Sequence, residues 1–405
     1  MGGRWRTAAV VGLLGLGMAA CGSPGSPGAA GDEDGGGSSA AADAAPYTVG
    51  LVYSKTGPLA TYGEEYREGF AVGLDYATNG TGEVDGHKIV LKEADDAGDP
   101  AKAVSAATEL IGNGAKVIAG STSSGVALQV APLAADNKVL FISGPAATDA
   151  ITGINTYTFR SGRQTHQDIR TAGTMIGDVT GKKVTVFAQD SAFGQANVAG
   201  VKAVLGAEGA KVTSVAVPAN ATDLTPFATT LKEQKPDLVF VAWAGTNATQ
   251  MWRTLSQQGV FEHSTVVTGL DIKASYPSFG PVAGRITFLS HFFDGAADNT
   301  QYRALASGLR KAGHEVDLFS TDGFSGAQMV VHALKEGKND PDAMVQALEG
   351  WTFDGPKGAM TIRAEDHALL QPMFTARLVR SGTGYRAKLV DTLSPGQVAP
   401  LVAKD

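Results

Sequence analysis

The sequence predicts an α/β protein with mostly parallel sheets, in a chain long enough for two lobes. Short runs rich in valine and isoleucine alternate with amphipathic helical patterns along nearly the whole chain. This alternation is typical of parallel strands joined by right-handed crossovers. Most strand candidates are continuous apolar runs, as expected for strands that are covered on both faces. The chain from Tyr47 onward is too long for one ordinary core, which favours two lobes.

The strand candidates follow one another in order along the chain. They occupy 48–53, 88–92, 116–119, 139–142, 183–187, 212–217, 238–243, 265–268 and 286–289. The helices between them carry apolar stripes, of which the clearest are Val104-Ala107-Ile111, Ile169-Ala172-Ile176-Val179 and Tyr302-Leu305-Leu309-Ala312. The pattern changes near the C-terminus, where 357–363 and 374–393 are predicted to form strands linked by glycine-rich turns, one of them at 381–384.

The N-terminus has the pattern of a secretory signal peptide. Arg4 and Arg6 precede an apolar run that is too short to cross a membrane. Small residues then lead to Cys21, in a setting that resembles the lipobox of bacterial lipoproteins, where this thiol is acylated. We therefore expect a signal peptide over 1–20, lipidation of Cys21 and a flexible linker over 21–46, which has almost no large apolar side chains. The mature protein would be extracytoplasmic and held at the cell membrane by its lipid.

Composition and motifs argue against several other functions. The net charge of −7, with no basic cluster, disfavours nucleic-acid binding. The sequence lacks the nucleophile elbow, the phosphate-binding loop and the zinc-protease motif, so we predict that the protein is not an enzyme. The seven histidines are scattered without ligand spacing, so we expect neither a metal site nor a cofactor. No later apolar run is long enough for a membrane span, so the lipid would be the only membrane attachment.

Polar loops follow several predicted strands, and ligands of open α/β sheets bind at such places. Asp95 and Asp96 follow the second strand and are expected to brace the loop, with cation binding as the alternative. Asp99 precedes a proline in the pattern of a helix N-cap. The hydroxyl-rich segment 120–125 follows the third strand and begins a helix, a setting that offers donors to a carboxylate. The loop after the fourth strand is also rich in small residues.

Four phrases in fixed order resemble the leucine/isoleucine/valine-binding protein family, the type I periplasmic binding proteins of ABC transporters. They are TGPLATYG at 56–63, DDAGDPAKA at 95–103, STSSG at 121–125 and DSAFG at 190–194. The resemblance covers nearly the whole mature chain. It implies two doubly wound α/β lobes joined by three crossovers, the Venus-flytrap architecture. Lobe 1 would comprise 47–160 and 291–370, and lobe 2 would comprise 161–290 and 371–405.

The resemblance also implies roles for individual residues in the cleft between the lobes. Ser123 matches the serine that holds the ligand carboxylate, and Ala146 matches a residue that uses its backbone atoms. Thr148 would supply a neighbouring threonine, although a shift of one residue exchanges it with Ala147. Helix capping is the competing role for Ser123 and Thr148. Tyr62 matches the aromatic residue that packs on the ligand side chain.

The second lobe departs from the family pattern at three positions. Asp271 matches the acidic residue that receives the ligand ammonium group, but it is one methylene shorter than the usual glutamate. Phe193 replaces an aromatic residue that normally carries a hydroxyl. A further family tyrosine falls within 242–246, where the aligned positions are small here. Trp243 lies beside these positions, and it either shapes the pocket wall or packs in the core. These departures leave open a larger side chain or a ligand that is not an α-amino acid.

The function expected from the sequence is capture of a small zwitterion, a branched-chain or other amino acid, by lobe closure. The partners would be the permease and ATPase subunits of an ABC importer, and the receptor itself is expected to be a monomer. Two alternatives remain. One is a ligand sensor of the same fold, and the other is an importer receptor for amides, urea-like compounds or aromatic acids.

Overall fold

The computed structural model describes residues 44–403. The predicted signal peptide, Cys21 and all but the end of the predicted linker lie outside the described residues. The first strand, β1 (Ala44–Tyr53), begins at Ala44 rather than near Tyr47. The last residues assigned to the linker therefore belong to the strand, where the Ala45 carbonyl is 2.7 Å from Nδ1 of His87.

The first sheet has the strand order β2-β3-β1-β4-β5-β6. All neighbouring pairs are parallel except β2 with β3. Besides β1, the strands are β2 (Glu83–Val84), β3 (His87–Asp95), β4 (Val117–Gly120), β5 (Leu140–Ser143) and β6 (Thr158–Arg160). Every residue of β4 and β5 is buried, as the continuous apolar runs predicted.

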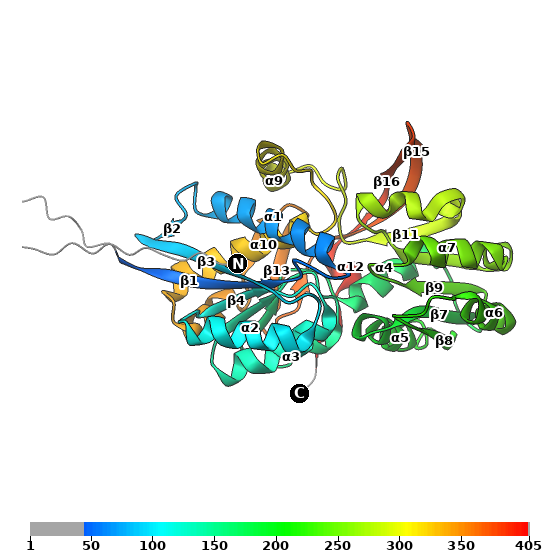
Figure 1. Ribbon diagram of the computed structural model, residues 1–405, viewed down its shortest axis with the longest axis horizontal. Coiled ribbons are helices and arrows are strands. Elements are labelled where there is room, and N and C mark those ends of the chain that lie inside the picture. Colours follow the sequence, from blue (N-terminus) through cyan, green and yellow to red (C-terminus); the bar gives the residue numbers. More distant parts are fainter. Residues whose placement is uncertain (1–43, 404–405) are drawn as a thin grey trace, which may run out of the picture. The chain divides into compact units, whose positions relative to one another are not determined.

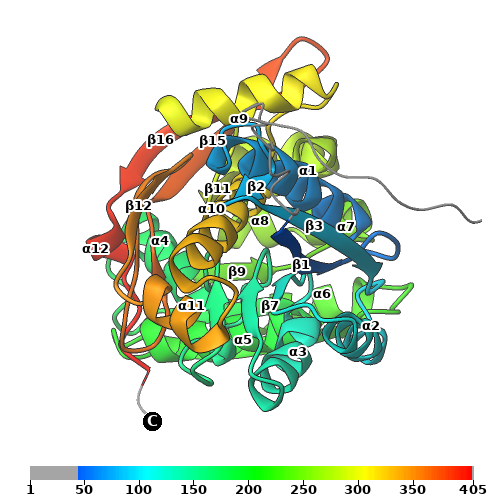
Figure 2. The same ribbon diagram turned by 90° about the vertical axis from the view of Figure 1, so that its left-hand side faces the viewer.

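Helices cover both faces of this sheet, which makes it doubly wound (Figure 1). Val49 and Leu51 of β1 pack in one core cluster and Val52 in another, because successive strand side chains point to opposite faces. The first face receives α1 (Ala60–Ala77), α10 (Ser320–Gly337) and α11 (Pro341–Leu348). The other receives α2 (Pro100–Gly112) and α3 (Ser124–Asp136), and α9 (Thr300–Lys311) lies against α1 (Figure 2).

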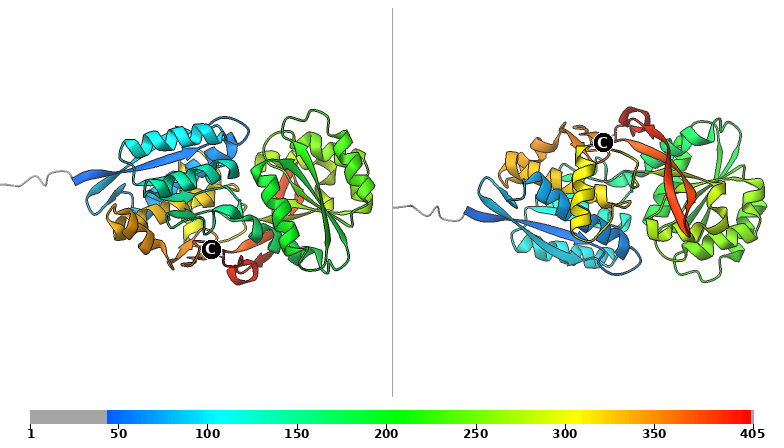
Figure 3. Two further views of the ribbon diagram at one scale, coloured as in Figure 1. Left: turned by 90° about the horizontal axis from the view of Figure 1, so that it is seen from below. Right: turned by 90° about the horizontal axis from the view of Figure 1, so that it is seen from above.

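The second sheet has the order β16-β15-β11-β10-β9-β7-β8. Its parallel strands are β7 (Lys183–Asp190), β8 (Lys211–Pro218), β9 (Leu238–Ala242), β10 (Thr265–Gly269) and β11 (Ile286–Ser290). The antiparallel hairpin β15 (Met373–Ser381) and β16 (Gly384–Leu393) completes it through β11, as Figure 3 shows in red. The predicted turn at 381–384 closes this hairpin, since Ser381 pairs with Gly384.

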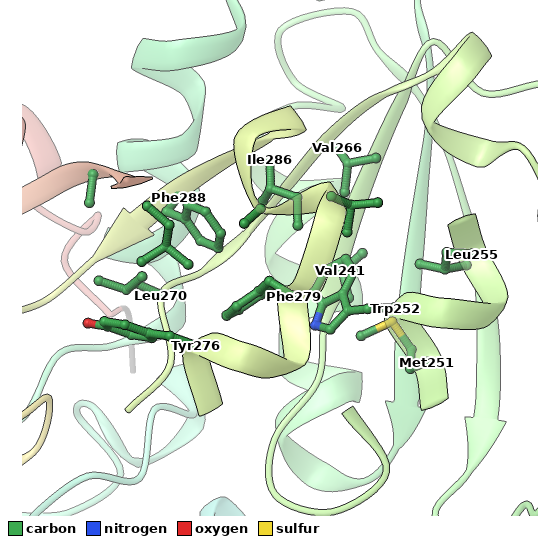
Figure 4. Packing of buried hydrophobic residues seen from close by; sticks show 14 of the residues in the cluster. Val241, Met251, Trp252, Leu255, Val266, Leu270, Tyr276, Phe279, Ile286 and Phe288 are labelled. Carbon is green, nitrogen blue, oxygen red and sulfur yellow. The ribbon is translucent and has the colours of Figure 1, made fainter. Parts of the chain in front are cut away.

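Helices also cover both faces of the second sheet. One face holds α4 (Thr165–Ile176) and α5 (Ala192–Val204). The other holds α6 (Thr225–Gln234), α7 (Ala248–Gln257), α8 (Val260–His263) and the 3₁₀ segment η2 (Lys273–Arg285). Figure 4 shows aromatic residues of the core on this latter face, where the Phe279 ring lies 5.2 Å from that of Trp252 and 4.9 Å from that of Phe288.

The chain passes between the two sheets three times, after β6, after β11 and before β15. A small sheet of β12 (Thr352–Gly355), β13 (Gly358–Ile362) and β14 (Leu369–Leu370) precedes the third passage, and the short helices η1 (Asp149–Ile151) and α12 (Pro395–Val398) complete the elements. The predicted α/β fold with two doubly wound lobes is confirmed. No described helix combines the length and apolar character that crossing a membrane requires.

Candidate ligand-binding site

A cavity of about 370 Å³ lies where the carboxyl ends of parallel strands from both sheets meet. The first sheet contributes loops that follow β1, β4, β5 and β6, and the second contributes loops that follow β7, β9, β10 and β11. This is the position at which open α/β sheets bind ligands. The volume falls in the range of pockets for small organic molecules, roughly 300 to 1,000 Å³.

The turn after β4 presents Ser123 to this cavity. Gly120 has a φ of 117°, and a Cβ atom there would lie 2.0 Å from the Val52 carbonyl oxygen, so only glycine fits. The Thr122 hydroxyl oxygen accepts a hydrogen bond from the Ser54 amide at 3.2 Å and fixes the loop. Ser123 is the residue before α3, but its side chain makes no capping hydrogen bond. Its hydroxyl is therefore available beside the free N–H groups of the first helical turn.

The loops around this turn are braced by Asp95, the last residue of β3, and by Asp96, which follows it. Asp95 accepts hydrogen bonds from the amides of Lys55 and Thr56 and from the Thr56 hydroxyl. These hydrogen bonds hold the pKa of Asp95 at about 2, below its usual value. Asp96 accepts a 2.6 Å hydrogen bond from the Ser54 hydroxyl. Both aspartates thus brace the loop, as predicted.

The structure does not bring Ala146 and Thr148 to the cavity lining. Both are buried, and the lining residues of their loop are Pro145 and Ala147. The Thr148 hydroxyl oxygen accepts a hydrogen bond from the Ala150 amide at 3.3 Å, which is the helix-capping role. The one-residue shift considered from the sequence places Ala147 at the cavity, but alanine has no hydroxyl to offer a carboxylate.

Asp271 lines the cavity just after β10 of the second sheet, and its hydrogen-bond partner Tyr62 lies in α1, which packs on the first sheet. Tyr62 donates a 2.7 Å hydrogen bond from its hydroxyl to Oδ1 of Asp271, which also accepts from the Ile272 amide at 2.8 Å. Burial raises the pKa of Asp271, and the hydrogen bonds from Tyr62 and Ile272 oppose this rise. The Gly245 amide donates to the Tyr62 hydroxyl oxygen at 3.3 Å. Residues from the two lobes therefore meet directly at the cavity.

Aromatic side chains form much of the remaining wall. Phe193, in the first turn of α5, and Trp243, just after β9, both line the cavity with Tyr62 and Phe319. The Trp243 ring lies nearly parallel to that of Phe187 at 5.9 Å, so it shapes the wall and also packs on the core. The rings of Tyr62 and Phe319 are 4.7 Å apart.

Three titratable lining residues had no predicted role. Arg163 follows β6, Asp168 lies in the first turn of α4, and His291 follows β11. Nε of Arg163 is 3.3 Å from Oδ2 of Asp168, and Nη1 donates to the Pro145 carbonyl oxygen at 2.7 Å. Burial raises the pKa of Asp168 to about 6 despite the opposing charge of Arg163. Arg163 could not be predicted from the pattern of strands and loops, because β6 has only three residues and no recognisable period.

The chemistry of the cavity is that of reversible binding. Hydroxyl and amide donors lie on one side, a carboxylate lies on the other, and aromatic rings lie between them. The described residues contain no group of three or more histidine, cysteine, aspartate or glutamate side chains placed to hold a metal ion.

Comparison with known proteins agrees with this architecture. The pattern of the family described as "Periplasmic binding protein" matches residues 46–383. The Leu/Ile/Val-binding protein BraC3 of Rhizobium johnstonii is 27% identical over 330 residues, which cover 76% of this chain and 89% of that protein. A branched-chain amino acid ABC transporter structure from Rhodopseudomonas palustris has 32% identity and a TM-score of 0.75, covering 88% of this chain and 100% of that one.

A second Rhodopseudomonas palustris structure, a solute-binding protein in complex with 4-hydroxybenzoate, has 23% identity and a TM-score of 0.78. It covers 86% of this chain and 97% of that one, and it supports the fold alone. Fold and cleft together define a two-lobed solute-binding protein. The chain belongs to the periplasmic binding protein family, of the Leu/Ile/Val-binding type. Members of this family bind solutes for transporters, so the prediction that the protein is not an enzyme is confirmed.

Proposed function

We propose that the protein captures a zwitterionic solute, a branched-chain or other amino acid, and delivers it to the permease of an ABC importer. The observation that carries this proposal is the placement of Ser123 and Asp271 on one cavity, in loops that belong to different sheets. Ser123 and the start of α3 would receive the carboxylate, since a helix N-terminus favours negative charge. Asp271 would receive the ammonium group.

A ligand held in this way binds best when the lobes are together. Its two charged ends contact different lobes, so the closed form has the higher affinity and the ligand shifts the equilibrium toward it. The permease would then recognise the closed receptor. The lipid on Cys21 and the linker would keep the receptor near the permease, which raises its effective concentration there. We propose that the receptor works as a monomer.

One observation favours a second candidate, an aromatic carboxylate. The Tyr62 hydroxyl already satisfies Oδ1 of Asp271 in the described structure. A ligand without an ammonium group could leave this pair intact and fill the space between Phe193, Trp243 and Phe319 with its own ring. Several proteins of similar fold have aromatic acids bound, 4-hydroxybenzoate and benzoate among them.

A thermal-shift screen of amino acids, their amides and aromatic acids tests these two candidates, because a ligand of the folded state raises its melting temperature. Calorimetry of Asp271→Asn then separates them. An amino acid should lose about 2 kcal/mol, roughly 30-fold in affinity, when its ammonium group loses a buried charge partner. Benzoate should bind nearly as before. Asp391→Asn, at an exposed carboxylate of β16, is the control. Unchanged amino-acid affinity in Asp271→Asn would remove Asp271 from the site.

The proposed lipid anchor has its own test. Cys21→Ala should move the protein from the membrane fraction to the soluble fraction of cells, because the apolar run before it cannot anchor the chain once it is cleaved. Continued membrane retention of the variant would contradict anchoring through Cys21.

A further inference from the structure

Arg163 places a positive charge in the cavity wall. The proposed binding of the ligand carboxylate by Ser123 and the start of α3 does not involve this charge. It lies at the first passage of the chain between the sheets and lines the cavity with 11% of its side chain exposed. Pro145 accepts a hydrogen bond from Nη1, and Asp168 lies beside Nε. No hydrogen bond with another described residue engages Nη2, so part of the guanidinium remains available.

The Arg163 side chain lies on the same side of the cavity as Ser123. The Ala146 amide donates to the Ser121 carbonyl oxygen at 3.3 Å, which ties the loop after β5 to the loop that carries Ser123. Arg163 in turn donates to Pro145 of that loop. Three consecutive post-strand loops are thus joined at one end of the cavity, and Arg163 is the cationic side chain among them that lines it.

We infer that Arg163 binds the carboxylate of the ligand together with Ser123 and makes the site selective for carboxylates over the corresponding amides. The inference rests on the proposed function in requiring a ligand that enters this cavity, and it applies to amino acids and aromatic acids alike. A guanidinium is always charged, and its planar fork matches a carboxylate. With Thr148 engaged in capping and Pro145 and Ala147 without side-chain donors, Arg163 supplies what this loop lacks.

Asp168 acts here as a positioning residue. Its Oδ2 forms an ion pair with Nε of Arg163 at 3.3 Å, and neither Nε of Arg163 nor Oδ1 of Asp168 has a hydrogen-bond partner among the described residues. It holds one edge of the guanidinium and offsets part of its charge. Lys357 pairs with Asp322 at 2.8 Å and also donates to Gln371 at 2.7 Å, and neither Lys357 nor Asp322 lines the cavity. Burial and the nearby charges of Arg163 and Lys357 lower the pKa of His291 well below its usual value.

This arrangement predicts effects of opposite sign for the two partners. Arg163→Gln removes the cation and should weaken carboxylate binding by about 10- to 100-fold, the range for a hydrogen bond to a charged group. Asp168→Asn keeps the size and shape of the side chain but removes the competing charge, so carboxylates should bind more tightly. A merely structural pair would weaken binding in both variants.

The test is calorimetry with two matched ligand pairs, L-leucine with L-leucinamide and benzoate with benzamide. Wild-type protein should prefer the acid of the pair it binds, and Arg163→Gln should lose that preference. Arg163→Lys keeps the charge without the planar fork and should retain part of the preference for the acid. This variant still tests the inference if Arg163→Gln does not fold. The control is Arg170→Gln. Arg170 lies on the same helix as Asp168 and forms an exposed ion pair with Glu208, so its replacement should leave ligand affinity unchanged.

The outcomes separate this inference from the proposed function. Equal binding of acid and amide by wild-type protein, or an unchanged preference in Arg163→Gln, would overturn the role of Arg163 and leave solute binding intact. Binding of benzoate but not leucine would contradict the amino-acid proposal, and the benzoate pair would then decide the role of Arg163. Binding of neither acid would overturn both.

Discussion

Gly245, in the loop after β9, packs against the loop after β1 next to the cavity. Its φ is 76°, and a Cβ atom there would lie 2.9 Å from the Pro58 carbonyl oxygen and 3.4 Å from a Leu59 methyl carbon. Gly245→Ala therefore forces the two loops apart by a few tenths of an ångström. This movement weakens the Gly245–Tyr62 hydrogen bond, which contributes about 1 kcal/mol. Ligand affinity should fall by roughly 5- to 30-fold, the equivalent of about 1 to 2 kcal/mol.

The backbone strain of alanine at positive φ must be separated from this loop contact. Gly350 has a φ of 75°, and a Cβ atom there would meet nothing within 4 Å. Both alanine variants should lose about 1 to 2 kcal/mol of unfolding free energy in urea titrations, because left-handed backbone strains any L-residue with a Cβ. Only Gly245→Ala should lose affinity in calorimetry. Wild-type affinity in Gly245→Ala would refute the argument that the loops must meet when ligand is bound.

Three further predictions concern stability. Thr148→Ala should lower the unfolding free energy by about 1 kcal/mol, since Oγ1 caps the Ala150 amide, while ligand affinity in calorimetry stays unchanged. Phe288→Ala should cost about 3 to 5 kcal/mol in urea unfolding, because the ring is fully buried against Phe279. Burial raises the pKa of Asp168 from 3.8 to about 6, so the folded state holds this proton at pH values where the unfolded state has released it. Stability should therefore fall by about 3 kcal/mol between roughly pH 4 and pH 6, and urea titrations of Asp168→Asn should show a smaller fall; an equal fall would contradict the assignment.

The sequence predicted the central strands because their complete burial leaves a visible apolar pattern. Strands β4 and β5 are buried at every residue, so their apolar runs are continuous and bounded by turns. Strands β2, β6 and β14 have two or three residues each and carry no period that a sequence can reveal. They depend on neighbouring strands for their hydrogen bonds, and those neighbours come together only in the folded chain.

The helix pattern shows a related limit. The apolar stripe of α4 was predicted to include Val179, and Val179 is indeed buried in the same cluster as Ile169 and Ala172. The helix itself ends at Ile176, where Gly177 adopts a φ of 65°. An apolar period records which side chains reach the core, whereas the end of a helix depends on backbone conformation.

The ends of the predicted strands located the site correctly. The sequence did not determine which individual residues of a loop face the cavity. Ser123, Phe193 and Asp271 lie within three residues of a helix start or strand end, and all of them line the cavity. In the loop after β5, alternate residues face the cavity and the interior, so an offset of one residue exchanges a lining residue such as Ala147 for the buried Thr148. Neither composition nor spacing fixes this alternation in a loop without regular structure.

Hydrogen bonds between residues on opposite sides of the cavity are harder to predict from the sequence than the lining residues themselves. The Tyr62 hydroxyl and the Asp271 carboxylate are 209 positions apart in the chain, and each was predicted to contact a ligand rather than the other. Their hydrogen bond means that an ammonium group gains its contact with Asp271 only by replacing or sharing the tyrosine donor. The ammonium group then contributes only the difference between its own contact with Asp271 and the Tyr62–Asp271 hydrogen bond that it replaces. The Arg163 guanidinium, in contrast, is partly free before any ligand binds. The carboxylate end of the ligand should therefore dominate recognition, and the ammonium end should tune it.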